Sequence, residues 1–269
     1  MRVAYPGREG AHSAAACALL HPEVEAQALR SFADVVEAVA DGRVESGVLP
    51  IESSVSGPVT ETHDLLVGSP VSINAQAILP IRHYLVGIAE VPLGEIRVVR
   101  SHPAALDQCR RLLSSLPEAT AIAAGTTADA AAQVARDGDP TEVAIASERA
   151  AALHGLVVLA ANVGDHPDAF TRFVAVSNRT ELGDAPSWRI AFSFQTDHQP
   201  GALHRAIEPF ARHGLDLVQL TSRPIPRTPW RYRFDAVVSG HPLEDVVRRT
   251  LAEVREQTER FTVFGSYPV

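Results

Sequence analysis

The sequence predicts an α/β protein with two domains, and three observations support this prediction. Short apolar strands alternate with helical stretches from the N-terminus to residue 178, which is the order of βαβ units. A polar segment over 179–187 contains Gly and Pro and has the composition of a linker. From 188 to 269 the predicted order is βαββαβ, a ferredoxin-like layout.

The first domain, residues 1–178, is built from strands that run into helices. Ser31 and Gly42 bracket one predicted helix as its N-cap and its stop, and Pro103 fits the first position of another because its missing N–H costs nothing there. In chain order the predicted elements are a strand over 2–5, helices over 14–20 (led by Ser13) and 31–41, strands over 44–54, 71–79, 81–88 and 96–100, a helix over 103–116, a strand and a helix over 121–138 and again over 142–155, and strands over 156–164 and 171–178.

The second domain, residues 188–269, opens with a strand that has one apolar face. Trp188, Ile190, Phe192 and Phe194 recur at a period of two residues, as in a strand packed on a core. The elements expected after it are a helix over 200–213, a strand over 215–222, a Pro-rich loop over 224–229, a strand over 230–238, a helix over 243–258 and a strand over 261–267.

The charged residues exclude several classes of function. The chain has 24 basic and 32 acidic side chains, a formal net charge of −8, which argues against a nucleic-acid-binding surface. Every basic residue is an arginine. The absence of lysine excludes Schiff-base chemistry, pyridoxal phosphate enzymes included, and it excludes the P-loop.

Neither a metal nor a membrane is expected. Cys17 and Cys109 are far apart in the sequence and form no CxxC pair, and the histidines fit no metal-ligand spacing such as HExxH. The first residues lack the apolar stretch of a signal peptide, and no apolar run approaches the roughly 18 residues of a membrane span. We therefore expect a cytoplasmic protein.

Hydroxyl-bearing or small residues occupy four predicted strand-to-helix junctions of the first domain. In open α/β folds the carboxyl ends of the strands line a crevice, and helix N-termini there offer N–H groups that suit an anion. Each junction alone also fits an ordinary N-cap. Together they predict a small anionic ligand. The four junctions are Gly7–Ser13, Glu52–Gly57, Ser101–Pro103 and Thr126–Thr127.

Two further polar positions adjoin apolar strands. Glu52 follows the sequence VLPI, so it either caps the following turn or orients a substrate in a cleft. Thr171 and Arg172 begin an apolar strand after a loop that contains Gly164 and Pro167. They mark either the edge of a cleft or a strand-start hydroxyl beside a surface arginine.

Several sequence motifs follow one another in a fixed order. They are AYPGREGAHSAAA, LPIESSVSGPV, SHPAALDQC, GTTADAA, AIASERAAALHGL and DAFTRFVAV in the first domain, and PGALHRAI and TSRP in the second. As a set they are specific, they cover nearly the whole chain, and they resemble those of prephenate dehydratase with a C-terminal ACT regulatory domain.

The resemblance implies a fold and a reaction. The catalytic domain would have two lobes like those of periplasmic binding proteins, one over about 1–75 and 156–178 and the other over about 76–155. Residues 188–269 would form the ACT domain. The reaction would convert prephenate to phenylpyruvate, CO2 and water without a cofactor, because formation of an aromatic ring drives it.

The resemblance also implies roles for individual residues. Thr171 would assist departure of the ring hydroxyl, with Arg172 and Glu52 beside it as catalytic residues. L-phenylalanine would act as effector on a homodimer or homotetramer assembled through the ACT domain. The implied substrate-binding residues are Ser13, Ser53, Ser54, Ser101, Gln108, Thr127 and Phe173. The implied allosteric residues are Gly201, Ala202, Leu203, Ser222, Arg223 and Pro224.

Departures from the family pattern leave alternatives open. An arogenate dehydratase or a prephenate decarboxylase could use the same scaffold, and so could a non-catalytic amino-acid sensor. Retention of Thr171 argues against the decarboxylase, which needs no acid at the ring hydroxyl. The departures are Ser53 for asparagine, Ala104 for glutamine, Asp168 and Ala169 in a loop that usually carries asparagine, and Thr221 for the glutamate of the ACT motif.

Overall fold

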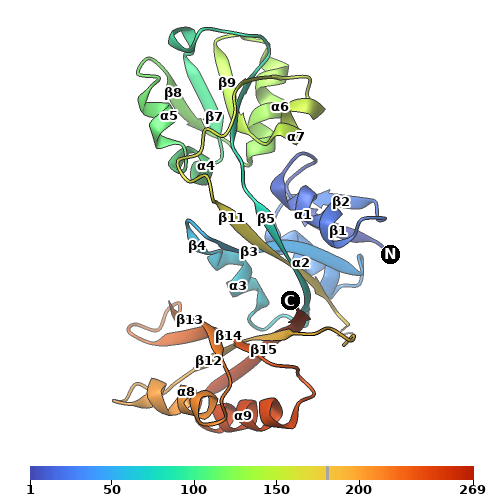
Figure 1. Ribbon diagram of the computed structural model, residues 1–269, viewed down its shortest axis with the longest axis vertical. Coiled ribbons are helices and arrows are strands. Elements are labelled where there is room, and N and C mark those ends of the chain that lie inside the picture. The colour runs from blue at the N-terminus through green and yellow to red at the C-terminus, as the bar shows by residue number, and fades with distance from the viewer. Residues whose placement is uncertain (180–181) are drawn as a thin grey trace. The chain divides into compact units, whose positions relative to one another are not determined.

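The computed structural model describes residues 1–179 and 182–269, so Thr180 and Glu181 of the predicted linker lie outside the described residues. The chain is an α/β protein whose strands form two mixed sheets, which confirms the predicted class (Figure 1). Among the described residues, none of the helices combines the length and the apolar character that crossing a bilayer requires.

The chain divides into two compact units. The first unit comprises Met1–Val35, Val48–Val59 and Ala77–Phe173. The second comprises Val36–Gly47, Thr60–Gln76 and Val174–Val269. Four elements contribute residues to both units: α2 (Phe32–Ala40), β3 (Ser46–Ser53), β5 (Ser72–Pro80) and β11 (Phe170–Ser177).

The first unit contains a five-stranded sheet in the order β10-β6-β9-β7-β8, with helices on both faces (Figure 1). The elements of this unit are β1 (Val3–Pro6), α1 (His12–Leu20), β2 (Ala26–Leu29), β4 (Gly57–Pro58), β6 (Tyr84–Gly87), η1 (Leu93–Glu95), β7 (Val98–Ser101), α4 (Pro103–Asp107), α5 (Arg110–Ser114), β8 (Thr120–Ala123), α6 (Thr127–Asp137), β9 (Glu142–Ala146), α7 (Glu148–Leu153) and β10 (Val157–Ala160).

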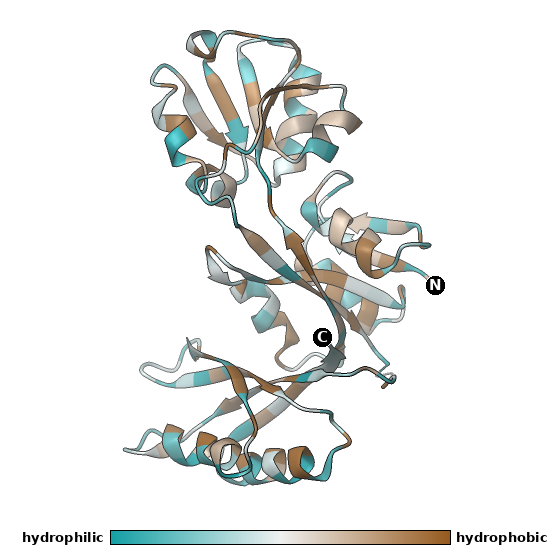
Figure 2. Ribbon diagram, in the orientation of Figure 1, coloured by the Kyte–Doolittle hydropathy of each residue, from teal (hydrophilic) through white to brown (hydrophobic). Residues whose placement is uncertain are grey.

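Side chains of that sheet alternate between two hydrophobic cores. Val86, Ala144 and Ala146 pack with alanines of α6 and α7, whereas Leu85 and its neighbours pack with α4 and Cys109. Hydrophobic residues accordingly gather on these strands (Figure 2). Small residues at the α6 face let the helix approach the sheet closely. The same unit also holds β1 and β2, which pair in parallel, and parts of β3 and β11; the order of these strands is β11-β3-β1-β2.

The second unit has the predicted βαββαβ order. Its elements are α3 (Thr60–Leu66), β12 (Trp188–Gln195), α8 (Ala202–Arg212), β13 (Leu217–Pro224), β14 (Tyr232–Ser239), α9 (Asp245–Glu256) and β15 (Arg260–Pro268). The strands follow the order β13-β14-β12-β15, and β15 is joined to β5 by one bridge, Gly265 to Ile73. Ile190, Phe192 and Phe194 pack against α8 and α9, as the period of two predicts.

Three predictions about elements were wrong. The single helix over 103–116 is two helices, because the Asp165 carboxylate accepts hydrogen bonds from the N–H groups of Arg110 and Arg111 and so caps a second helix start. Helix α1 starts at His12, with Ala11 and not Ser13 before it. The short elements β2, β4 and α3 were missed.

Gly265 is the residue on which the β15–β5 bridge depends. Its φ is +148°, and a Cβ there would lie 2.1 Å from the Ile73 carbonyl oxygen. Gly265→Ala is therefore expected to lower the free energy of unfolding by about 2 kcal/mol or more. Urea unfolding measures the change. Gly94→Ala is the control, because Gly94 has open space for a methyl group. Equal changes in the two variants would contradict the account.

Candidate active site

The segment Glu52–Pro58 forms a tight hairpin at the end of β3. Glu52 pairs with Pro58 and Ser53 pairs with Gly57 across the antiparallel β3–β4 ladder. The Ser53 hydroxyl accepts hydrogen bonds from the N–H groups of Val55 and Ser56, both at 3.2 Å. Gly57 has a φ of +77°, which a glycine adopts without strain. The hairpin therefore holds its hydroxyl groups in one conformation.

The first residues of β11 lie against this hairpin. The Ser54 N–H donates to the Phe170 carbonyl and the Phe170 N–H donates to the Ser54 hydroxyl, both at 2.9 Å. Two residues away, Arg172 Nε lies 3.2 Å from Glu52 Oε2. These contacts pair 54 with 170 and 52 with 172. Such a pairing is an antiparallel register.

In that register the three predicted catalytic residues do not all lie on the same face of the strands. Successive side chains of a strand point to opposite faces, so Glu52 and Arg172 share one face. By the same alternation, Ser53 and Thr171 belong to the opposite side of their strands. The structure thus brings Glu52 into contact with Arg172, whereas Thr171 is not part of that pair.

Gln108 reaches the same hairpin from the end of α4. Its amide Nε2 donates to the Ser56 hydroxyl at 3.4 Å, and its Oε1 lies 2.9 Å from Nε2 of the buried His83. His83 in turn stands edge-on to the ring of His12, with 6.1 Å between the centroids. His12 precedes Ser13 at the start of α1, so a chain of contacts connects α1, Gln108 and the hairpin.

The Gly7–Ser13 and Thr126–Thr127 junctions also meet. A Cβ at Gly7 would lie 3.4 Å from the Thr126 methyl group, and the Ser147 hydroxyl donates to the Gly10 carbonyl at 2.7 Å. Thr126 itself caps α6, since its hydroxyl accepts from the Asp129 N–H at 2.9 Å. Two of the four predicted junctions therefore adjoin at this place.

Three predicted substrate-binding residues are enclosed. Ser101 is fully buried and its hydroxyl donates to the Ile145 carbonyl at 2.6 Å, a bond that ties β7 to β9. Phe173 is 2% exposed and Thr127 is 9% exposed. Of these three residues, Ser101 already donates its hydroxyl proton to a backbone carbonyl.

The histidines at this place are neutral at pH 7. Burial lowers the pKa of His12 to about 4, and the neighbouring His83 lowers it further. Burial also lowers the pKa of His83, although its hydrogen bond with Gln108 acts in the opposite direction. In the part of the chain that the structure describes, no three His, Cys, Asp or Glu side chains are grouped as a metal site.

The predicted allosteric residues of the second unit lie on two faces of its sheet. Gly201 precedes α8, and Ala202 and Leu203 line a pocket of about 130 Å³. Ser222 and Pro224 pair across the β13–β14 ladder with Phe234 and Tyr232, two aromatic residues that line the same pocket. The other lining residues are Thr196, Asp197, His198, Gln199 and Arg231.

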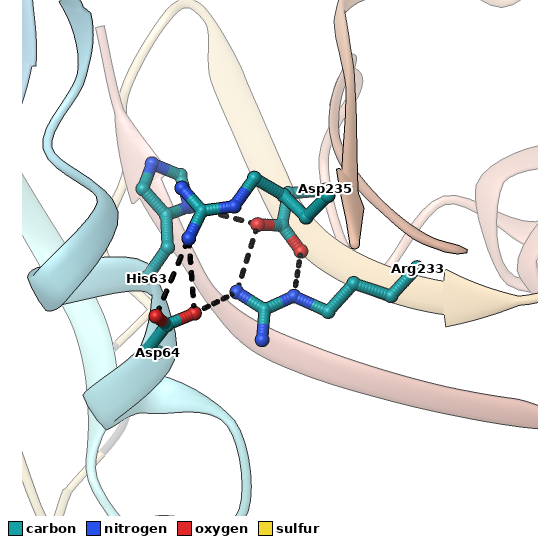
Figure 3. Close-up of polar contacts among 5 residues, drawn as sticks. His63, Asp64, Arg233 and Asp235 are labelled. Carbon is teal, nitrogen blue, oxygen red and sulfur yellow. Dashed lines mark hydrogen bonds and ion pairs between the residues drawn. The ribbon is translucent and has the colours of Figure 1, made fainter. Parts of the chain in front are cut away.

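Arg223, between Ser222 and Pro224, belongs to the opposite face, where it joins a charged cluster. One of its guanidinium nitrogens lies 3.2 Å from Asp64 of α3. Arg233 binds the same carboxylate at 2.5 Å (Figure 3). Arg233 also contacts Asp235 at 3.2 Å. The sequence prediction for Arg223 did not include this partner. We call these residues, with His63, the α3 charge cluster.

The α3 charge cluster is largely buried at its centre. Arg233 is 7% exposed and Asp235 is 3% exposed, and His63 Nδ1 lies 3.4 Å from Asp235 Oδ2. Burial alone would raise the pKa of Asp235, but contacts with His63, Arg233 and Ser193 outweigh it, so the pKa lies below its ordinary value. Asp235 is therefore ionised at neutral pH and needs its cation.

His83 and most of the α3 charge cluster were not predicted from the sequence as functional residues. One signal was present for the cluster: RYRFDAVV places Arg233 and Asp235 two residues apart, on one face of a predicted strand, among apolar residues. Opposite charges in that arrangement indicate a buried pair. For His83 the sequence predicted a strand over 81–88, but nothing in it indicated that Gln108 would be the hydrogen-bond partner.

Comparisons with known proteins agree with the motifs. The family model for prephenate dehydratase matches residues 3–181. A bifunctional chorismate mutase/prephenate dehydratase of Aquifex aeolicus is 36% identical over 236 residues, which cover 87% of this chain but 64% of the relative. An arogenate dehydratase/prephenate dehydratase of Arabidopsis thaliana is 32% identical over 279 residues, covering 100% of this chain and 73% of the relative.

A solved structure is similar over the full length. The crystal structure of a prephenate dehydratase from Arthrobacter aurescens, in complex with L-Phe, superimposes with a TM-score of 0.90 at 30% identity. The match covers 100% of this chain and 90% of that one.

Removing one member of the α3 charge cluster should destabilise the folded protein. Arg233→Met leaves Asp235 buried without its main cation, so we expect the free energy of unfolding to fall by about 3–5 kcal/mol. Urea unfolding followed by circular dichroism measures it. The control is Arg248→Met, which removes an exposed pair with Asp245 and should change stability by less than about 1 kcal/mol. A loss of that smaller size at Arg233 would count against the account.

Proposed function

Because the chain belongs to the prephenate dehydratase family, we propose that prephenate binds at the Glu52–Pro58 hairpin and the first residues of β11. The enzyme is a prephenate dehydratase, which converts prephenate to phenylpyruvate in phenylalanine biosynthesis. One observation carries the placement. The hairpin contacts both the start of β11, where Thr171 lies, and the amide of Gln108.

The reaction needs little from the protein besides position and a proton donor. Prephenate carries two carboxylates and an allylic ring hydroxyl. The C–C bond to the ring carboxylate breaks and its electron pair enters the ring, while the C–O bond breaks with its pair on oxygen. A proton on that oxygen makes the leaving group water. The aromatic product supplies the driving force, so the proposal includes no cofactor.

We assign proton donation to Thr171. Its hydroxyl would hydrogen-bond to the leaving oxygen as a general acid. Threonine is a weak acid in water, so a site that excludes water and fixes the donor carries much of the effect. Phe173 supports this assignment, because it lies two residues along the same strand face and is buried. The Thr171 side chain is therefore anchored beside the core.

We propose that the two carboxylates of prephenate are bound mainly by neutral hydrogen-bond donors. Ser53 shares a strand face with Thr171, Ser54 lies in the hairpin, and Gln108 offers amide N–H groups. Ser13 follows His12 at the start of α1. Arg172 adds positive charge, and its contact with Glu52 orients it. Thr127, at the start of α6, remains a predicted contact, and Ser101 supports the sheet.

The regulatory proposal concerns the second unit. We propose that 188–269 form an ACT domain and that 1–178 form a catalytic domain of two lobes. The βαββαβ order and the likeness to the Arthrobacter enzyme support this. A dimer through β13 would fit, because β13 ends its sheet and exposes Val218 and Leu220. Unpaired edge strands favour pairing with a second chain.

L-phenylalanine suits the pocket beside α8. Asp197, which pairs with Arg205, and Arg231, which pairs with Glu259, line it and present opposite charges to the ammonium and the carboxylate of an amino acid. Tyr232, Phe234 and Leu203 offer apolar surface for the aromatic ring. The relative from Arthrobacter aurescens was crystallised with L-Phe.

The α3 charge cluster offers a route from this pocket toward the hairpin. Arg223 lies between Ser222 and Pro224 in β13, and it binds Asp64 on the face away from the pocket. Helix α3 follows β4 of the hairpin directly in the chain. A shift of β13 on binding the effector would therefore pull on α3.

Thr171→Ala tests the catalytic proposal. With purified enzyme and prephenate alone, phenylpyruvate formation should fall roughly 10²–10³-fold, because one preorganised donor is lost. Thr171→Ser keeps the hydroxyl and should retain activity within about tenfold. Absorbance of phenylpyruvate in alkali measures the rate.

Other outcomes separate the alternatives. A wild type that consumes prephenate but forms a decarboxylated, non-aromatic product is a decarboxylase. Faster turnover of arogenate than of prephenate assigns the arogenate preference. Binding without turnover of either compound contradicts the enzyme proposal.

Asp197→Asn tests the regulatory proposal. L-phenylalanine should inhibit the wild type, and the variant should need roughly tenfold more for half-inhibition because the contact with the ammonium is weakened. The rate without L-phenylalanine should not change. Calorimetric titration gives the affinity directly. Asp184→Asn is the control, and an equal shift in both variants would contradict the assignment.

A further inference from the structure

His83 is a buried, neutral ring that contacts Gln108 and no substrate group of the proposed site. We propose that His83 is a positioning residue: its Nε2–H holds the Gln108 side chain so that the amide N–H groups face the Glu52–Pro58 hairpin and a carboxylate of the substrate. This inference rests on the proposed function, because it deepens the role assigned to Gln108.

The position of the proton on the His83 ring determines which way the Gln108 amide faces. His83 Nε2 lies 2.9 Å from Gln108 Oε1, and Gln108 Nε2 lies 3.4 Å from the Ser56 hydroxyl. If Nε2 carries the proton, it donates to the amide oxygen and the NH2 group faces the hairpin. If Nε2 is bare, the amide turns over and its oxygen faces the hairpin. An oxygen there would repel a carboxylate.

Burial selects the first arrangement. His83 is 5% exposed, and within the described residues its Nδ1 has no hydrogen-bond partner. A proton on Nδ1 would leave a buried N–H without an acceptor, whereas a proton on Nε2 leaves only a lone pair without a donor. Buried N–H groups are orphaned less often than acceptors because they cost more. The ring therefore carries its proton on Nε2.

The ring also stays uncharged, so it presents one donor to Gln108 and no net charge to the site. Burial lowers the pKa of His83, and the edge-on ring of His12 is neutral too, with a pKa of about 4. A lysine or arginine at this position could hold the amide oxygen as well, but it would bring a charge into a buried pocket.

Backbone contacts fix both partners. The Val163 N–H donates to the His83 carbonyl at 2.9 Å, and the Asp165 N–H donates to the Gln108 carbonyl at 2.6 Å. Gly164 lies between them, and a Cβ there would be 3.4 Å from His83 Cδ2. Three consecutive residues thus set the distance between the ring and the amide. The amide loses little freedom when it binds a carboxylate, because it is already held.

The test compares His83→Leu, which removes the donor, with His83→Gln, whose amide N–H can occupy the position of Nε2. With prephenate as substrate, His83→Leu should raise KM roughly tenfold and change kcat less than about threefold, because Gln108 binds a group that is present in both ground and transition states. His83→Gln should restore KM to within about threefold of wild type.

A double-mutant cycle separates positioning from general support. In the Gln108→Leu background, His83→Leu should raise KM by less than about twofold, since the residue it acts through is gone. An equal effect of His83→Leu in both backgrounds overturns the proposal.

Nitrogen-15 spectra of the histidine rings in the wild-type enzyme give a second measurement that needs no variant and no turnover. They should show His83 protonated at Nε2 and bare at Nδ1. The opposite tautomer, or a ring charged at pH 7, overturns the proposal even if variants fail to fold. Absence of phenylpyruvate from the wild type would refute the proposed function instead, and the spectra would still decide the tautomer.

Discussion

The register between β3 and β11 is the constraint on which the arrangement of the candidate site depends. Two short contacts, Ser54 with Phe170 and Glu52 with Arg172, fix it. Because side chains alternate, a slip by one residue would exchange the faces of Thr171 and Arg172. From Phe173 onward both faces of β11 are buried, so such a slip would force Phe173 and Val174 to exchange packing sites that differ in size.

A second regularity concerns charge. The chain has only arginines as cations, and those at the functional places have a carboxylate partner, as in Arg172 with Glu52 and Arg233 with Asp235. Paired cations attract a dianion less strongly than free ones do. The substrate carboxylates are then recognised by neutral donors, namely hydroxyl groups and an amide. The orientation of these donors matters more than their number. This explains why the tautomer of a buried histidine can affect binding.

Local signals predicted much of the fold. The N-cap Ser31 and the terminating Gly42 depend on neighbours within a few residues, and the structure has them as expected. The break at Cys109 could not be predicted, because the carboxylate that causes it comes from Asp165. The contact of Asp64 with Arg233 joins residues 169 positions apart. Site residues were predicted from motifs, whereas their partners were not.

Strand alternation also gives the sheet of the second unit two roles. Ser222 and Pro224 belong with the pocket side, and Arg223 between them belongs with the α3 charge cluster. Coupling between sites is typically about 1–3 kcal/mol. The contact of Arg223 with Asp64 is partly exposed, because the Asp64 side chain is 49% exposed, so its loss is worth at most about 1 kcal/mol. A displacement of β13 that lengthened this contact would bias the balance between two states by an amount at the low end of that coupling. Leu217 of β13 packs with the core beside α8 and α9, so the pocket on one face and the contact of Arg223 on the other are connected through a single anchored strand.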